Sequence, residues 1–151
     1  MATPTQQTTD TAHLSTTTTA VASTVIRVTD LSRSINFYCD VFLCRIALRE
    51  ADTALLLSPD GFQIYLSAKA PHRHATNGAV GIQYLMWATD NEPELQRILE
   101  RLKAHDPATY RHVENGVTFL EAVDPDHGRV IVSYPSPARM PRKLIPTLFH
   151  V

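Results

Sequence analysis

Hydrophobic side chains recur along the chain in an order that predicts one strand, one helix and three further strands. After an apolar stretch with strand-like alternation, Leu31, Ile35, Tyr38 and Phe42 follow at helical spacing. Spacing of this kind gathers apolar side chains on one face of a helix. A Ser-Pro-Asp-Gly turn then separates two short apolar stretches, as in a β-hairpin. The predicted segments are the strand 23–28, the helix 31–43 and the strands 44–50, 53–58 and 62–68.

The second half of the chain repeats this order. Leu95, Ile98, Leu99 and Leu102 fall at i, i+3, i+4 and i+7, the spacing of an amphipathic helix. Pro93 fits the first turn of that helix. The predicted strands around it are 81–88, 110–115, 117–123 and 129–134.

The strand 44–50 alternates with a period of two. Cys44, Ile46 and Leu48 are apolar, and the residues between them are arginine or alanine. Since alternate residues of a strand point to opposite faces, these three side chains are predicted to share one face.

The two halves also share particular residues, which indicates an internal repeat of about 60 residues. Thr29-Asp30 and Thr89-Asp90 both close a strand and open a helix, and a Pro-Asp turn precedes an apolar strand at 58–67 and again at 124–133. One helix cannot cover both faces of the strands in its half, so the halves are expected to pair. The predicted fold is α+β, with two βαβββ modules forming curved mixed sheets around a central cavity and the helices outside. The predicted boundaries are a disordered tail at 1–21, modules at 22–70 and 81–135, a linker at 71–80 and a C-terminal tail at 136–151.

Composition narrows the classes of partner and compartment. The chain has 151 residues, a net charge of −1 and 44% hydrophobic residues, so nothing favours nucleic-acid binding. No apolar run approaches the roughly 20 residues that span a membrane, and the N-terminus lacks the features of a signal peptide. Cys39 and Cys44 are interpreted as reduced thiols. A cytoplasmic protein without a membrane or nucleic-acid partner is expected.

Two groups of residues resemble a known family. Over residues 22–135 the chain resembles the vicinal-oxygen-chelate superfamily, which includes glyoxalase I, fosfomycin-modifying enzymes, extradiol dioxygenases and bleomycin-resistance proteins. It departs from the family at Leu43, where a glycine commonly ends the first helix. The resemblance implies a homodimer with a cavity near the dimer interface. The matching residues are Val28, Asp30, Leu31, Arg33, Ser34, Phe37, Tyr38, Val41, Asp124-Pro125-Asp126 and Gly128.

The resemblance also identifies the positions where metal-using relatives carry His, Glu or Gln. Here these positions hold Ser23, Tyr65, Tyr84 and Ile131. Divalent cations prefer imidazole, carboxylate or thiolate ligands, so no metal or other cofactor is expected. Among the neighbouring residues only Gln83 offers a substitute ligand.

Strand alternation separates the side chains that line the predicted cavity from those that face the helices. The cavity side adds Arg27, Gln63, Met86 and Arg129 to the four family positions, with Phe119 or Glu121 from the seventh strand. The helix side is almost purely apolar and consists of Ile26, Val28, Ile64, Leu66, Leu85, Trp87, Val130 and Val132.

Several of these residues have two interpretations. Arg27 either forms an ion pair with Glu121 or Glu50, or anchors an anionic or carbonyl-bearing ligand. Tyr65 and Tyr84 either sandwich a planar ligand or fill the space of the missing metal centre.

The remaining histidines and the C-terminus complete the candidates. The pair His72 and His74 is assigned to a solvated loop, and His112 and His127 are isolated in sequence, so metal binding through them is disfavoured. Four large apolar residues near the C-terminus are predicted to pack on the protein's own surface or across a dimer contact, namely Leu144, Ile145, Leu148 and Phe149.

These features favour a metal-free small-molecule-binding protein, similar to proteins that sequester antibiotics or metabolites and need no catalytic residue. The neutral-to-basic cavity favours an anionic, aromatic or polyketide-like ligand. One alternative is an enzyme of the same fold, a lyase, isomerase or dioxygenase-like protein that is metal-independent or uses unconventional ligands. Another is a module that contacts other proteins through its C-terminal tail.

Overall fold

The computed structural model describes residues 21–69, 82 and 84–149, and it contains the repeat that the sequence predicts. Most of the predicted N-terminal tail, the linker 71–80 and Gln83 lie outside the described residues. The first half consists of β1 (Ser23–Arg27), α1 (Leu31–Phe42), β2 (Arg45–Arg49), β3 (Thr53–Leu57) and β4 (Gln63–Ser67). The second half consists of β5 (Leu85–Ala88), α2 (Glu92–His105), β6 (Tyr110–Glu114), β7 (Val117–Val123) and β8 (Arg129–Tyr134), and a 3-10 turn at Thr147–Phe149 follows.

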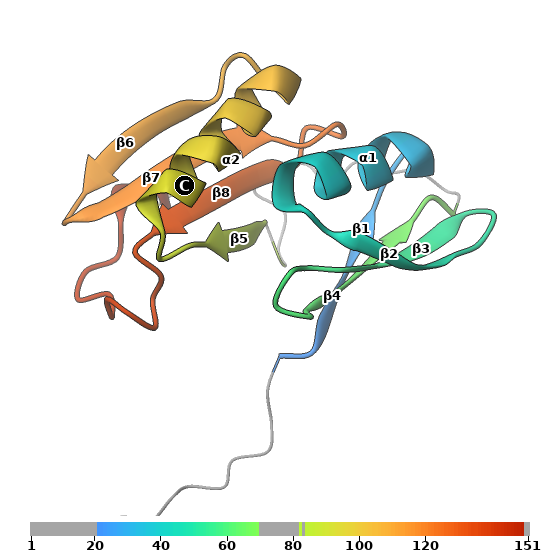
Figure 1. Cartoon of the computed structure of the whole chain (residues 1–151), viewed down its shortest axis with the longest axis horizontal. Helices are drawn as coiled ribbons and strands as arrows, with labels where there is room; N and C mark the ends of the chain where they lie inside the picture. Colours follow the sequence, from blue (N-terminus) through green and yellow to red (C-terminus); the bar gives the residue numbers. More distant parts are fainter. Residues whose placement is uncertain (1–20, 70–81, 83, 150–151) are drawn as a thin grey trace, which may run out of the picture.

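Each half forms one four-stranded mixed sheet with the same topology. The strand orders are β1-β4-β3-β2 and β5-β8-β7-β6, and in each sheet the first strand runs parallel to the last strand of its half. Figure 1 shows the two sheets next to each other, with α1 and α2 on the same side of them. The predicted α+β fold of two βαβββ modules is therefore confirmed. No helix of the described chain is long and apolar enough to cross a membrane.

The core lies between the helices and the outer faces of the sheets, as the alternation predicts. All eight residues assigned to the helix side belong to this core or pack against it. Trp87 stacks face to face on Phe42 of α1, with ring centroids 3.9 Å apart and planes at 5°. The prediction that Trp87 is a core residue is confirmed.

Helix α1 begins and ends with identifiable capping contacts. The Asp30 side chain accepts a hydrogen bond of 2.9 Å from the backbone N–H of Arg33, a standard N-cap. At the other end Leu43 has φ 55° and ψ 32°, the left-handed conformation that glycine adopts at low cost. Its side chain is 56% exposed, so packing offsets little of this cost. The departure from the family's glycine thus places a leucine in a strained conformation.

The turn between β7 and β8 joins the two halves. Asp124 accepts hydrogen bonds from the backbone N–H groups of Asp126 (2.9 Å) and Gly128 (2.7 Å), and from the hydroxyl of Tyr38 in α1 (3.2 Å). Asp126 in turn accepts from the backbone N–H and the hydroxyl of Thr29, and from the Ser34 hydroxyl at 3.4 Å. The two sequence groups that carry the family resemblance therefore contact each other across the halves.

The inner faces of the two sheets differ. In the first sheet one row of paired residues runs across the four strands through Val25, Tyr65, Leu55 and Leu48. Val25 is 69% exposed and Leu48 is 66% exposed. A register shift between Ile46 and Leu48 places these two side chains on opposite faces of β2. The prediction that Cys44, Ile46 and Leu48 share a face is therefore wrong, because the extra residue interrupts the alternation.

In the second sheet the C-terminal segment covers part of the inner face. Leu148 is only 8% exposed and packs in a cluster with Val117, Phe119 and Ile131. Leu144 and Ile145 are 65% and 69% exposed. Leu148 thus packs on the protein's own surface, whereas Leu144 and Ile145 do not do so within one chain. Their packing across a dimer contact stays a prediction, and the Phe149 side chain lies outside the described residues.

Candidate functional site

A cavity of ≈ 930 Å³ lies between β1 of the first sheet and β5, β8 and the β7–β8 turn of the second. We call it the seam cavity. Its size is typical of small-molecule sites, which measure roughly 300–1,000 Å³. Apolar, aromatic and polar side chains all line it. Its lining includes Ser23, Val25, Arg27, Phe62, Tyr84, Trp87, Asp124 and Arg129.

A buried pair of polar side chains borders the seam cavity. Tyr38 donates its hydroxyl to Asp124, and both residues line the cavity. Burial raises the pKa of Tyr38 well above its ordinary value, so the phenol stays protonated and keeps donating. Burial also raises the pKa of Asp124, although the N–H groups of Gly128 and Asp126 lower it in part. The oxygens of Asp124 are thus occupied by the turn and by α1, which indicates a structural role.

Tyr84 and Arg129 form the polar–aromatic wall of the seam cavity. The Arg129 guanidinium lies 5.4 Å from the centre of the Tyr84 ring, within the range of a cation–π contact. Burial raises the pKa of Tyr84, while the positive charge of Arg129 acts in the opposite direction. The phenol therefore remains a neutral group beside a cation, an environment suited to a planar or anionic ligand.

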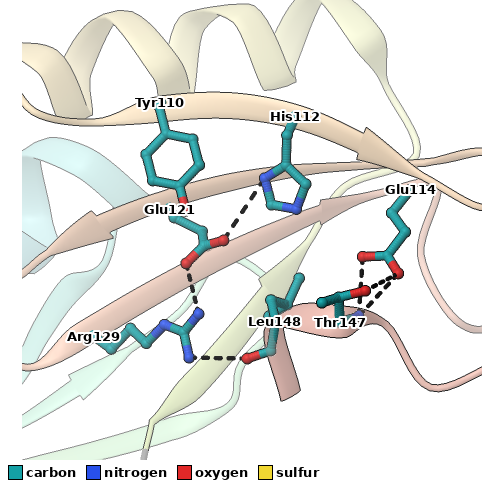
Figure 2. A pocket seen from close by; sticks show the side chains of 7 residues that line it. All are labelled: Tyr110, His112, Glu114, Glu121, Arg129, Thr147 and Leu148. Carbon is teal, nitrogen blue, oxygen red and sulfur yellow. Dashed lines mark hydrogen bonds and ion pairs between the residues drawn. The ribbon is translucent and has the colours of Figure 1, made fainter. Parts of the chain in front are cut away.

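A second, smaller hollow of ≈ 320 Å³ lies on the inner face of the second sheet, and Figure 2 shows it from close by. We call it the inner pocket. Its polar side chains come from β6, β7 and β8, and the C-terminal segment forms the remaining wall. The lining residues are Tyr110, His112, Glu114, Glu121, Arg129, Thr147 and Leu148.

Glu121 is the centre of the charged groups in the inner pocket. One carboxylate oxygen lies 2.6 Å from an Arg129 nitrogen, and the other lies 3.7 Å from Nδ1 of His112. The pKa of Tyr110 is raised, first by a hydrogen bond with Glu121 and then by burial. His112 Nδ1 is buried and has no hydrogen-bond partner in the described structure.

The predicted site residues divide between these places. Ser23, Arg27, Tyr84 and Arg129 line the seam cavity, and Glu121 joins Arg129 in the inner pocket. Glu121, one of the two predicted partners of Arg27, pairs with Arg129 and His112.

The other predicted residues line neither hollow. Gln63 and Tyr65 are neighbours on the inner face of the first sheet, where the tyrosine hydroxyl donates to the amide oxygen at 3.3 Å. Met86 is exposed on β5. Ile131 is fully buried in the cluster that contains Leu148.

The grouping of Tyr110, His112 and Glu121 was missed from the sequence. His112 looked isolated because its partner lies on the next strand. A signal was available, since Asn115 and Gly116 both have positive φ and form the two-residue turn between β6 and β7. A turn of this type fixes the register of a hairpin and places Tyr110 opposite Glu121.

The four family metal positions do not fit a metal ion. Ser23, Tyr65 and Tyr84 offer only hydroxyl groups, and Ile131 offers no ligand atom. Among residues 21–69, 82 and 84–149, no three His, Cys, Asp or Glu side chains are grouped so as to hold a metal. That the protein works without a cofactor stays a prediction.

Comparison with known proteins identifies the family. The model of the glyoxalase/bleomycin resistance protein/dioxygenase superfamily matches residues 20–132. The chain belongs to this superfamily. No curated protein matches the sequence.

Solved structures share the fold. The domain of the same description from Frankia sp. EAN1pec is 19% identical, with 76% of this chain and 96% of that chain covered and a TM-score of 0.67. The lactoylglutathione lyase from Agrobacterium tumefaciens is 22% identical, covers 76% and 92% and has a TM-score of 0.58. The oxidase ChaP-H2 is 14% identical, covers 77% and 93% and has a TM-score of 0.60. These superfamily neighbours include a lyase and an oxidase, so the fold alone does not select a reaction.

Proposed function

We propose that this superfamily member binds a small organic molecule without a metal ion, as a protein that sequesters an antibiotic or a metabolite. The seam cavity supports this proposal most directly, because it combines enough volume for such a molecule with aromatic surfaces and guanidinium groups. Capture of a ligand needs shape and a few polar anchors but no reacting group.

The lining of the seam cavity favours a planar, anionic ligand. Arg27 on β1 and Arg129 on β8 line the cavity from different sheets, and Arg129 is at the same time paired with Glu121, so Arg27 is the main candidate for the anion anchor. The carboxylates of the cavity are already occupied, since Asp124 accepts from backbone N–H groups and Tyr38, and Asp126 from Thr29. An aromatic carboxylate or a polyketide-like phenolate matches these groups by charge-assisted hydrogen bonding and stacking.

A thermal-shift screen of the untagged protein against planar aromatic carboxylates and polyketide antibiotics tests the proposal. A ligand at about 100 times its Kd stabilises the fold by ~2.7 kcal/mol, which raises Tm by roughly 5–10 °C in a protein of this size. Arg27→Ala and Tyr84→Ala should remove most of the shift. Arg45→Ala, on β2 at the far edge of the first sheet, is the matched control and should keep it.

Two results would count against the proposal. A shift that survives both Arg27→Ala and Tyr84→Ala would mean that the ligand does not use the seam cavity. Stoichiometric divalent metal in the purified protein, measured by elemental analysis, would overturn the metal-free part.

We also infer that the protein is a cytoplasmic homodimer. The exposed apolar row through Val25, Tyr65 and Leu48 supports pairing, because a second copy would cover it. Cys39 and Cys44 are free, as in a reducing compartment. Sedimentation should give twice the chain mass of 16.8 kDa, and Leu48→Arg should give the single mass. A wild-type protein that sediments as a monomer at high concentration contradicts the inference.

The inner pocket supports a second candidate, a metal-independent enzyme. His112, whose Nδ1 lies 3.7 Å from the Glu121 carboxylate, is the candidate general base of this pocket. Mass spectrometry of the ligand after long incubation separates the two functions. Unchanged ligand supports capture, whereas conversion that is lost in His112→Gln and kept in His105→Gln, at a position that lines neither hollow, supports catalysis.

A further inference from the structure

The C-terminal segment lies on the inner face of the second sheet with the contacts of a bound peptide. The Glu114 carboxylate accepts the backbone N–H of Thr147 at 2.9 and 3.0 Å and the Thr147 hydroxyl at 2.7 Å. Arg129 donates to the backbone carbonyl of Leu148 at 3.1 Å. Figure 2 shows Glu114 and Arg129 holding this segment from two sides. The carboxylate of Glu114 thus accepts from the donors of this segment, and the guanidinium of Arg129 donates to its carbonyl.

The Leu148 side chain occupies an apolar recess between these polar contacts. Val117, Phe119 and Ile131 are buried with it, and Tyr84 packs against the same cluster. Pro146 is buried as well, whereas Ile145, the residue just before it, is exposed. Hydrophobicity alone does not explain why Leu148 is the buried residue, since the tail contains other large apolar residues. The recess and the two charged anchors, Glu114 and Arg129, explain it.

The first sheet provides an internal comparison. Register and repeat place Gln63 of β4 where β8 has Arg129, and Leu55 of β3 where β7 has Glu121. The first sheet therefore lacks the arginine that binds the Leu148 carbonyl and the carboxylate paired with that arginine, and Val25 and Leu48 on its inner row remain exposed. The two inner faces thus differ in a group that binds a peptide carbonyl.

We propose that the inner face of the second sheet is a binding site for a short peptide that forms a 3-10 turn, with the chain's own Pro146–Leu148 as its resident ligand. The site takes an N–H and hydroxyl donor pair at Glu114, a branched apolar side chain in the recess and a carbonyl at Arg129. The same segment offered on a separate molecule competes for it. Exchange is feasible because the anchored part is short and Ile145, just before it, is exposed.

A fluorescein-labelled peptide of residues 143–151 tests the proposal by polarisation, with full-length chains throughout. In the wild type the resident segment occupies the site, so the apparent affinity for added peptide is reduced in proportion to the free fraction. Leu148→Asp removes the resident ligand and should bind the peptide at least about tenfold more tightly than wild type. Leu144→Asp makes the same change at an exposed position of the same tail and should behave as wild type.

The specificity of binding is tested on both partners. Adding Glu114→Gln to the Leu148→Asp chain should weaken peptide binding about tenfold, as expected for the loss of one charge-assisted contact. A peptide that itself carries Leu148→Asp should not bind. Equal binding by the wild-type, Leu148→Asp and Leu144→Asp chains would overturn the proposal.

Hydrogen exchange keeps the proposal falsifiable if Leu148→Asp does not fold. The Thr147 amide should be protected in the wild type and exchange about tenfold faster in Glu114→Gln, because the amide loses its charged acceptor. An unprotected Thr147 amide in the wild type would overturn the proposal.

This site is separable from the seam cavity, although Arg129 borders both. Peptide binding should be unchanged in Arg27→Ala, which lines only the seam cavity. Peptide binding that is lost in Arg27→Ala would place the peptide in the seam cavity and overturn the assignment.

Discussion

Removing the Asp126 carboxylate should weaken the contact between the two halves and lower the free energy of unfolding. Asp126→Ala deletes the acceptor for the N–H and hydroxyl of Thr29 and for the hydroxyl of Ser34. It also deletes an ion pair with Arg33 at 3.4 Å. The Arg33 side chain is 51% exposed. The Asp126 carboxylate itself is largely buried, with a side-chain exposure of 11%.

The magnitude follows from these contacts. The Ser34 hydroxyl is buried, and a buried donor that loses its acceptor costs about 1–3 kcal/mol. The exposed ion pair contributes only ~0–1 kcal/mol. We therefore expect Asp126→Ala to lower the free energy of unfolding by about 2–3 kcal/mol. Asp126→Asn keeps one carbonyl acceptor and should cost about half as much.

Urea unfolding at neutral pH, followed by the fluorescence of Trp87, measures the change in the free energy of unfolding. The matched control is Asp60→Ala in the corresponding turn of the first half, where the carboxylate accepts from Ser58 two residues away. This variant should lose less than ~1 kcal/mol. Equal losses for Asp60→Ala and Asp126→Ala, or a loss below ~0.5 kcal/mol for Asp126→Ala, would refute the reasoning.

Three further predictions concern single residues. Leu43→Gly should stabilise the protein by up to ~1 kcal/mol in thermal unfolding, because it relieves the left-handed strain, whereas Leu43→Ala should not. Burial raises the pKa of Asp124, so its carboxyl group stabilises the fold most when protonated, and this contribution is lost as the pH rises above about 4 and through the raised pKa. The wild type should thus lose stability relative to Asp124→Asn as the pH rises from about 4 through the raised pKa. A pH-independent difference between the two would contradict the cause. Leu148→Ala should cost about 2 kcal/mol, at the lower end for a buried leucine, whereas Ile145→Ala should stay within ~0.5 kcal/mol.

Most of the fold could be predicted because its determinants are local. The helical spacing of Leu31, Ile35, Tyr38 and Phe42 and the alternation around Trp87 both report directly on the core. The extra residue in β2 could not be predicted, since a strict alternation of Ile46 and Leu48 conceals a bulge that becomes visible only through the partner strand.

The candidate sites were harder to predict because their residues meet across strands. Arg27 and Arg129 were identified as cavity residues by alternation, and Tyr84 by the family resemblance. The contact of His112 with Glu121 depends on the register of the β6–β7 hairpin, which the Asn115-Gly116 turn sets. The burial of Leu148 depends on anchors more than 15 residues away in sequence, so tail hydrophobicity could not separate it from Leu144.

The position of Asp126 has a consequence for how the duplicated chain folds. The amide of Thr29, just before α1, finds its acceptor in the other half of the chain. Tyr38 of α1 likewise finds its acceptor in Asp124. The first half therefore does not complete its own hydrogen bonding as an isolated unit. We expect the two repeats to unfold together in one cooperative transition, rather than as two autonomous domains.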